Sequence, residues 1–88
     1  MMMEMQEMNI ALVMVLQEWD PFGMGTENYE PEIADAVFAV SEVEDDFELA
    51  GKIKAIYEFS FEEKLDLREY LQVAEKLIRI RNSFSCSL

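Results

Sequence analysis

The chain of 88 residues contains no histidine and a single cysteine, Cys86. Zinc sites of the Cys/His type, catalysis by Cys–His or Ser–His arrangements and haem ligation by histidine all need residues that are missing. One cysteine also excludes a disulfide within the chain. Carboxylates are therefore the only plentiful reactive groups.

Basic residues are absent from the first fifty positions, which carry 13 Asp and Glu and hence a charge of −13. Residues 51–88 carry 7 Lys and Arg against 6 Asp and Glu, so the net charge of the chain is −12. A field of this sign repels phosphate backbones and anionic lipids, which argues against nucleic acid and membrane surfaces as partners. We expect any electrostatically attracted partner to be a basic protein. The alternative is that the acidity only keeps the chain soluble.

Long hydrophobic runs are also missing. The longest run, Ile10–Leu16, has seven residues, whereas a membrane-spanning helix needs about 20. The N-terminal segment lacks the basic region and the cleavage site of a signal peptide, so we expect a cytoplasmic protein.

Hydrophobic residues make up 51% of the chain and charged residues 30%, a composition typical of one small globular domain. Periodicity predicts an all-α domain over residues 4–81, with four helices packed as an irregular bundle, and a flexible tail over residues 82–88. The helices are expected over about residues 4–18, from Pro31, from Asp45 and from Asp66, where proline or an acidic cap favours a helix start. The predicted core comprises Leu12, Leu16, Trp19, Val37, Phe38, Ile53, Ile56, Leu71, Ala74 and Leu77.

The first helix is apolar on more than one face. Leu12 and Leu16 lie on one stripe, and Ile10, Val13 and Met14 lie outside it. A short helix cannot turn both sets inward, so we expect the second set to form a weak homodimer contact. Because two subunits of charge −12 repel each other, high salt should favour this dimer.

The second helix has a predicted apolar inner face and a predicted acidic outer face. The inner face comprises Ile33, Ala34, Val37 and Phe38. The outer face comprises Glu32, Asp35, Ala39 and Glu42, spaced i, i+3, i+7 and i+10, and three of these residues are carboxylates. These three carboxylates are candidate interaction residues because they would point to solvent.

A loop with several aromatic residues and glycines joins the first two helices. Asp20, the proline after it and Gly23 match the preferences of a type I turn, in which the Asp side chain accepts hydrogen bonds from nearby amides. Trp19, Phe22 and Tyr29 surround this turn, and we expect Trp19 and Tyr29 to be mostly buried. Two interpretations stay open: an aromatic recognition loop, or a rigid corner whose rings close the end of the bundle.

Two segments of the sequence resemble a known family. The first is Trp-Asp-Pro-x-Gly-x-Gly at residues 19–25, followed by Tyr29 and by Glu-Ile-Ala-Asp at residues 32–35; the second is Ile-x-Ala-Ile-Tyr-Glu-Phe-Ser-Phe-Glu at residues 53–62. Together they resemble the YugE-like family of short bacillus-type proteins, domain of unknown function 1871, over about residues 8–82. This resemblance implies a small, all-helical cytoplasmic protein without an established activity. The loop and the helix after it also resemble small acidic toxin-immunity proteins, which implies a basic toxin as partner.

Neither an enzyme nor a metal or cofactor site is predicted. Residues 42–48 have the acids of an EF-hand loop but not its glycine or its spacing, and no nucleophile with a general base can be assembled. We therefore expect a non-enzymatic protein–protein interaction module, with immunity to a basic toxin or a structural homo-oligomer as alternatives. The candidate interaction residues are Trp19, Asp20, Phe22, Tyr29, Glu32, Asp35 and Glu42.

Overall fold

The structure, a computed structural model, describes residues 2–23, 25, 29–62 and 64–86. These residues form α1 (Met2–Trp19), α2 (Glu30–Glu42), α3 (Asp46–Phe61) and α4 (Leu67–Cys86). No strand occurs in this part of the chain, so the predicted all-α class with four helices is confirmed.

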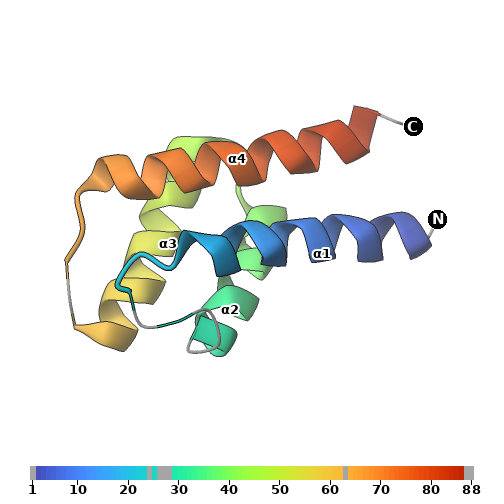
Figure 1. Cartoon of the computed structure of the whole chain (residues 1–88). Coiled ribbons are helices and arrows are strands. Elements are labelled where there is room, and N and C mark those ends of the chain that lie inside the picture. Colours follow the sequence, from blue (N-terminus) through green and yellow to red (C-terminus); the bar gives the residue numbers. More distant parts are fainter. Residues whose placement is uncertain (1, 24, 26–28, 63, 87–88) are drawn as a thin grey trace.

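The four helices pack as an irregular bundle. α1 and α4 lie side by side and antiparallel, α2 and α3 run across them, and the two ends of the chain leave the molecule on the same side (Figure 1). α4 packs mainly against α3 and α1, while α2 packs mainly against α3 and α1 from the other side. The loop between α1 and α2 therefore lies at the end of the molecule opposite the termini.

Local sequence signals set the starts of α2, α3 and α4. α2 begins at Glu30, one residue before the expected proline, which occupies the first turn. Asp45 caps α3 as predicted, because its Oδ1 accepts a hydrogen bond from the Glu48 amide at 2.7 Å. Asp66 plays the same part before α4, where its Oδ1 accepts from the Arg68 amide at 3.2 Å.

α4 extends further than the sequence predicts. It continues to Cys86, so the domain boundary expected at residue 82 falls inside the helix, while residues 87 and 88 lie outside the described residues. Neither glycine nor proline follows Arg81 to stop the helix. The Arg81 guanidinium also fixes this part of α4 to the end of α2, since it donates to the carbonyls of Val40 at 2.8 Å, Val43 at 2.6 Å and Glu44 at 3.2 Å.

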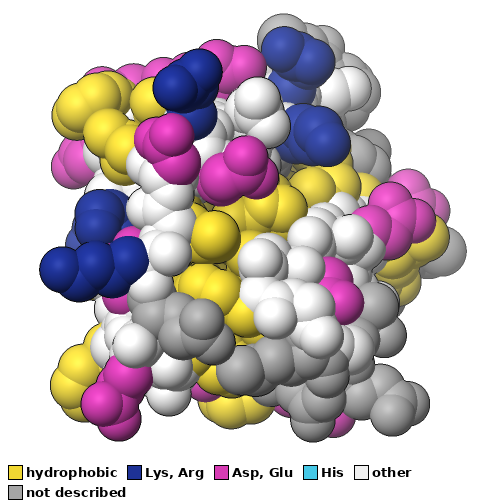
Figure 2. Space-filling model, turned by 60° about the vertical axis from the view of Figure 1, so that its left-hand side comes forward, with side chains coloured by type: hydrophobic (Ala, Val, Ile, Leu, Met, Phe, Trp, Pro, Cys, Tyr) yellow, Lys and Arg dark blue, Asp and Glu magenta, His cyan; other side chains and the backbone are white. Residues whose placement is uncertain are grey.

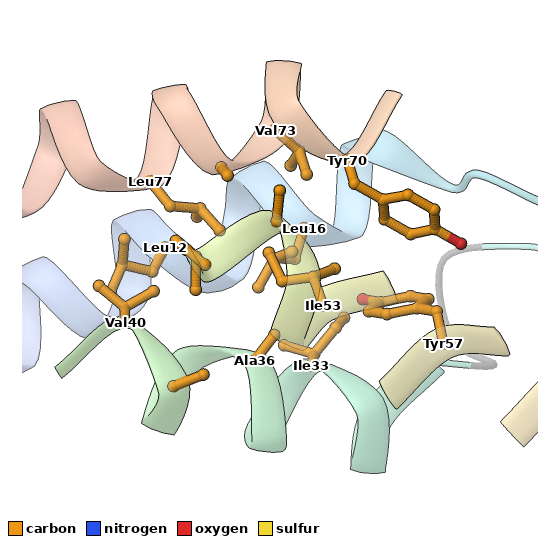
Figure 3. Close-up of a cluster of buried hydrophobic side chains, with 14 of the residues drawn as sticks. Leu12, Leu16, Ile33, Ala36, Val40, Ile53, Tyr57, Tyr70, Val73 and Leu77 are labelled. Atoms are coloured by element: carbon orange, nitrogen blue, oxygen red, sulfur yellow. The ribbon is translucent and has the colours of Figure 1, made fainter. Parts of the chain in front are cut away.

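The core is one cluster of aliphatic and aromatic side chains drawn from all four helices (Figure 3). Five of the predicted core residues are buried: Leu12, Leu16, Ile53, Ala74 and Leu77. Four more are half-buried and pack against this cluster: Trp19, Val37, Ile56 and Leu71. The prediction for Phe38 is wrong, because 65% of its surface is exposed.

The error at Phe38 arises because α2 is rotated relative to the predicted orientation. Its buried residues are Glu32, Ile33, Ala36, Ala39 and Val40, so Ala39 of the predicted outer face is buried and Ala34 of the predicted inner face is exposed. The predicted and the observed faces both repeat with helical spacing, so periodicity alone does not choose between them. The observed orientation of α2 turns Ala36 and Ala39 toward the neighbouring helices and leaves the large ring of Phe38 outside. Small side chains at this contact let the helix axes approach closely.

Candidate functional site

The loop after α1 is organised by the side chain of Asp20. The Gly23 amide donates to the Asp20 carbonyl at 3.2 Å, which closes the predicted four-residue turn. Asp20 Oδ2 accepts from the Gly25 amide at 3.3 Å, and Asp20 Oδ1 accepts from the Tyr29 hydroxyl at 2.6 Å. The Tyr29 hydroxyl in turn accepts from the Phe22 amide at 3.1 Å. The prediction that Asp20 accepts amide hydrogen bonds is confirmed.

The backbone of this loop explains its glycines. Gly23 and Gly25 have φ values of 66° and 96°, a region that glycine enters at little cost. Asp20 has φ of 36°, and aspartate is one of the few other residues that tolerate this region. The Trp-Asp-Pro-x-Gly-x-Gly segment therefore meets requirements of the turn itself.

The aromatic rings around the loop pack on one another. Trp19 lies edge-on to Tyr57 and Tyr70, with ring centroids 5.1 and 5.5 Å apart. Tyr29 is fully buried, and its ring centroid lies 5.7 Å from that of Tyr57 and 5.2 Å from that of Phe61. These contacts join α1, the loop, α3 and α4 at one end of the bundle.

Neither Trp19 nor Phe22 stands free on the surface. Both are half-buried, and Phe22 packs on Phe61 with ring centroids 5.4 Å apart. The burial predicted for Tyr29 is confirmed, and that of Trp19 is confirmed in part. The packing favours a rigid corner over a recognition loop for these rings, although apolar surface is still visible among charged side chains at this end of the molecule (Figure 2).

Glu58 links α3 to α4 through a polar cluster that the sequence did not indicate. Its Oε1 accepts from Lys54 Nζ at 2.8 Å, and its Oε2 accepts from the Leu65 amide and the Tyr70 hydroxyl, each at 3.2 Å. The hydrogen bond from Lys54 lowers the pKa of Glu58 from its ordinary value of 4.5, desolvation opposes this shift, and the bonds from Leu65 and Tyr70 add to it. Burial raises the pKa of Tyr70.

The prediction that Glu32 is an exposed interaction residue is wrong. Glu32 is only 8% exposed, because the rotation of α2 turns it inward within the first helical turn. Within the described part of the chain, its Oε1 and the hydroxyl of Tyr57 are buried without a hydrogen-bond partner. Burial, with a smaller contribution from the Glu32 carboxylate, raises the pKa of Tyr57, whose hydroxyl points toward the aliphatic part of the core (Figure 3).

The other two predicted carboxylates lie on the surface. Asp35 and Glu42 are exposed, and the exposed ring of Phe38 lies between them in the sequence, three residues after Asp35 and four before Glu42. These spacings place all three residues on one side of α2. We call them the outer strip of α2.

A mostly apolar groove lies beside this strip, between α1 and α2. One hollow of about 310 Å³ is lined chiefly by Met8, Leu12, Ala34, Val37, Phe38 and Val40, and Arg81 of α4 also lines it. A second hollow of about 440 Å³ is lined by Val13, Gln17, Glu30, Ile33 and Ala34. Because Ala34 lines both hollows, we treat them together as the α1–α2 groove.

Another groove, of about 310 Å³, lies between α1 and α4. It contains the exposed part of Trp19, together with Glu18, Glu69 and Lys76. Its charged side chains are of both signs, whereas the charged side chains of the outer strip of α2 are both acidic.

The three apolar residues of α1 that were expected to form a homodimer contact differ in their exposure. Ile10 and Met14 are exposed on 59% and 53% of their surfaces. Val13 is half-buried, packs against the core and lines the α1–α2 groove. The predicted second face of α1 is therefore smaller than expected and consists of Ile10 and Met14.

Two features are absent from the residues that the structure describes. Among them, no group of three or more His, Cys, Asp or Glu side chains could hold a metal ion. In the same residues, no helix has the length and apolar character needed to cross a membrane.

Comparison with known proteins supports both the family resemblance and the helical fold. Residues 11–87 match the family described as a domain of unknown function, DUF1871. The chain is 41% identical over 76 residues to the uncharacterized protein YugE of Bacillus subtilis (strain 168), a match that covers 86% of this chain and 88% of YugE. Its fold resembles the crystal structure of a Bacillus stearothermophilus protein with a TM-score of 0.86 at 37% identity, covering 89% of this chain and 96% of that one.

Proposed function

The chain belongs to the DUF1871 family, and we propose that it is a non-enzymatic interaction module that binds a basic partner protein through α1 and α2. The observation that carries this proposal is the outer strip of α2, where an exposed phenylalanine ring lies between two exposed carboxylates. The absence of Lys and Arg from residues 1–50 supports it, because no cation on α1 or α2 competes for these carboxylates. The proposal includes a cytoplasmic location, which the family resemblance implies.

A non-enzymatic role is supported by the residues that are available. The sequence has no histidine, and the tyrosine hydroxyls at the loop are engaged or enclosed: that of Tyr29 donates to Asp20 and that of Tyr70 to Glu58. A tyrosine hydroxyl is protonated at neutral pH at its ordinary pKa of 10.0, and burial raises the pKa of Tyr57 and Tyr70 further, so neither supplies a general base.

A neutralising partner of a basic toxin is the specific form of this proposal that the loop resemblance suggests. In that form, carboxylates on the exposed side of α2 would pair with Lys or Arg of the toxin, and the association rate would fall as salt screens the attraction.

The proposal is tested by affinity capture from a lysate of the source organism, with quantitative mass spectrometry. The wild-type protein is compared with the double variant Asp35→Lys/Glu42→Lys and with the control Glu75→Lys, which reverses one exposed charge on α4. We expect a basic protein to be captured by the wild type and the control and lost by the double variant. Capture of only neutral or acidic proteins, or equal capture by all three, would contradict the proposal.

A structural homo-oligomer is the second candidate, and the exposure of Ile10 and Met14 favours it. Light scattering at low and high ionic strength tests this candidate, since high salt weakens repulsion between two subunits of charge −12. A salt-favoured dimer that Met14→Glu abolishes would support it. A monomer at high salt and high protein concentration would exclude it.

A further inference from the structure

The α1–α2 groove has the length and the lining that suit a short helix. Its two hollows follow α1 from Met8 to Gln17, nine helical steps or roughly 14 Å at 1.5 Å per residue. Small Ala34 lines both hollows, and Phe38 lines one of them. An amphipathic helix of about three turns covers this length with apolar anchors at i, i+3 or i+4, and i+7.

The charges around the groove indicate a partner that carries basic side chains. Glu30 lines one hollow, and exposed Asp35 and Glu42 lie on the outer strip of α2 beside the other. Among the described residues, Arg81 is the one cation that lines either hollow. Its guanidinium already donates to three backbone carbonyls at the end of α2, so the groove offers its carboxylates to cations of a partner.

From this complementarity we infer that the occupant of the α1–α2 groove is a basic amphipathic helix of the partner protein. Its apolar stripe lies in the groove against Ala34 and Phe38, and its Lys or Arg residues face Asp35 and Glu42. This inference rests on the proposed function and adds the form of the partner and the place where it binds. A second copy of this chain fits less well, because its own net charge is −12.

Isothermal titration calorimetry with two synthetic peptides tests the inference. Both peptides have 14 residues, seven Leu and seven Lys. In one, the leucines recur at i, i+3, i+4 and i+7 so that they share one face of a helix, and in the other Leu and Lys alternate. We expect the helix-periodic peptide to bind the wild-type protein about tenfold or more tightly than the alternating peptide, because only the first presents one continuous apolar stripe as a helix.

Two pairs of variants locate the binding site. Phe38→Ala removes a wall of the groove, and its control Phe59→Ala removes a ring that is 87% exposed on α3 and lines no groove described above. Ala34→Lys places a cation in the groove, and its control Ala55→Lys places one on an exposed position of α3. We expect each groove variant to weaken the helix-periodic peptide about tenfold and each control to leave its Kd unchanged. Since all four positions are exposed, circular dichroism should show unchanged helix content.

The possible outcomes separate the inference from the proposed function. Equal binding of both peptides, with no effect of Phe38→Ala or Ala34→Lys, would overturn the helix-in-groove inference and leave a charge-driven interaction intact. No binding of either peptide to the wild type would overturn the inference too, while the capture experiment with Asp35→Lys/Glu42→Lys would still decide the proposed function.

Discussion

Two buried tyrosines in ring contact should respond in opposite ways to the loss of their hydroxyl groups. Tyr29 and Tyr57 are both fully buried, with ring centroids 5.7 Å apart. The Tyr29 hydroxyl donates to Asp20 at 2.6 Å and accepts from the Phe22 amide at 3.1 Å. The Tyr57 hydroxyl has no hydrogen-bond partner among the described residues. We predict that Tyr29→Phe destabilises the fold and that Tyr57→Phe does not.

The hydrogen bonds give the size of each effect. A hydrogen bond to a carboxylate contributes about 1.5–3 kcal/mol and one between neutral groups about 1 kcal/mol, but partly exposed Asp20 and Phe22 regain water when the hydroxyl is removed. We therefore expect Tyr29→Phe to lower the free energy of unfolding by about 2 kcal/mol. Removing the unpaired hydroxyl of Tyr57 should leave that free energy unchanged or raise it by about 1 kcal/mol, since a buried unpaired polar group is itself unfavourable.

Urea unfolding followed by circular dichroism measures both effects. A loss of 2 kcal/mol lowers the urea midpoint by about 1–2 M for a small domain, provided that the m-value is unchanged. Equal losses in the two variants, or a loss of more than about 1 kcal/mol for Tyr57→Phe, would refute the assignment of Tyr29 as the hydrogen-bonded member of the pair.

Three further predictions use the same assay. Arg81→Ala should lower the free energy of unfolding by about 2–3 kcal/mol, because the end of α2 loses its charged donor. The control Arg79→Ala, at an exposed position, should lower it by less than about 0.5 kcal/mol. Equal losses would contradict the role of Arg81 in holding the end of α2. Asp45→Ala should cost about 1 kcal/mol by removing the cap of α3, and Asp45→Asn should restore most of it. The pKa of Glu58 is lowered in the folded state, so its stabilisation is complete above the ordinary value of 4.5 and is lost as the pH falls through the folded-state pKa. Glu58→Gln should therefore flatten the decline of the urea midpoint between about pH 5 and pH 3, and an unchanged slope would count against this linkage.

Features that depend on neighbouring residues could be predicted from the sequence. The caps at Asp45 and Asp66 and the proline in the first turn of α2 act within one helical turn, so the starts of α2, α3 and α4 were predicted to within about a residue. The turn at Asp20 and Gly23 is local in the same sense. Spacing within these segments was sufficient because the hydrogen-bond partners are also close in the sequence.

Features that depend on distant residues could not be predicted in this way. α2 has two faces of similar periodicity, and only packing against α1 and α3 decides that Glu32 turns inward and Phe38 outward. Arg81 finds its carbonyl partners 37 to 41 positions earlier in the chain, and no local pattern indicates such a contact. As a result, the sequence predicted only part of the candidate interaction surface. It predicted Asp35 and Glu42, but it did not predict the exposed ring of Phe38 or the groove beside it.

Nuclear magnetic resonance of the ¹⁵N-labelled protein, titrated with the helix-periodic Leu/Lys peptide, tests most directly whether α1 and α2 form the binding surface. We predict that amide shifts change in residues 8–17 and 30–42, with the largest changes near Ala34 and Phe38, and that Asp35→Lys/Glu42→Lys reduces them. Changes concentrated in α3 and α4, or spread evenly over the chain, would contradict binding at the α1–α2 groove.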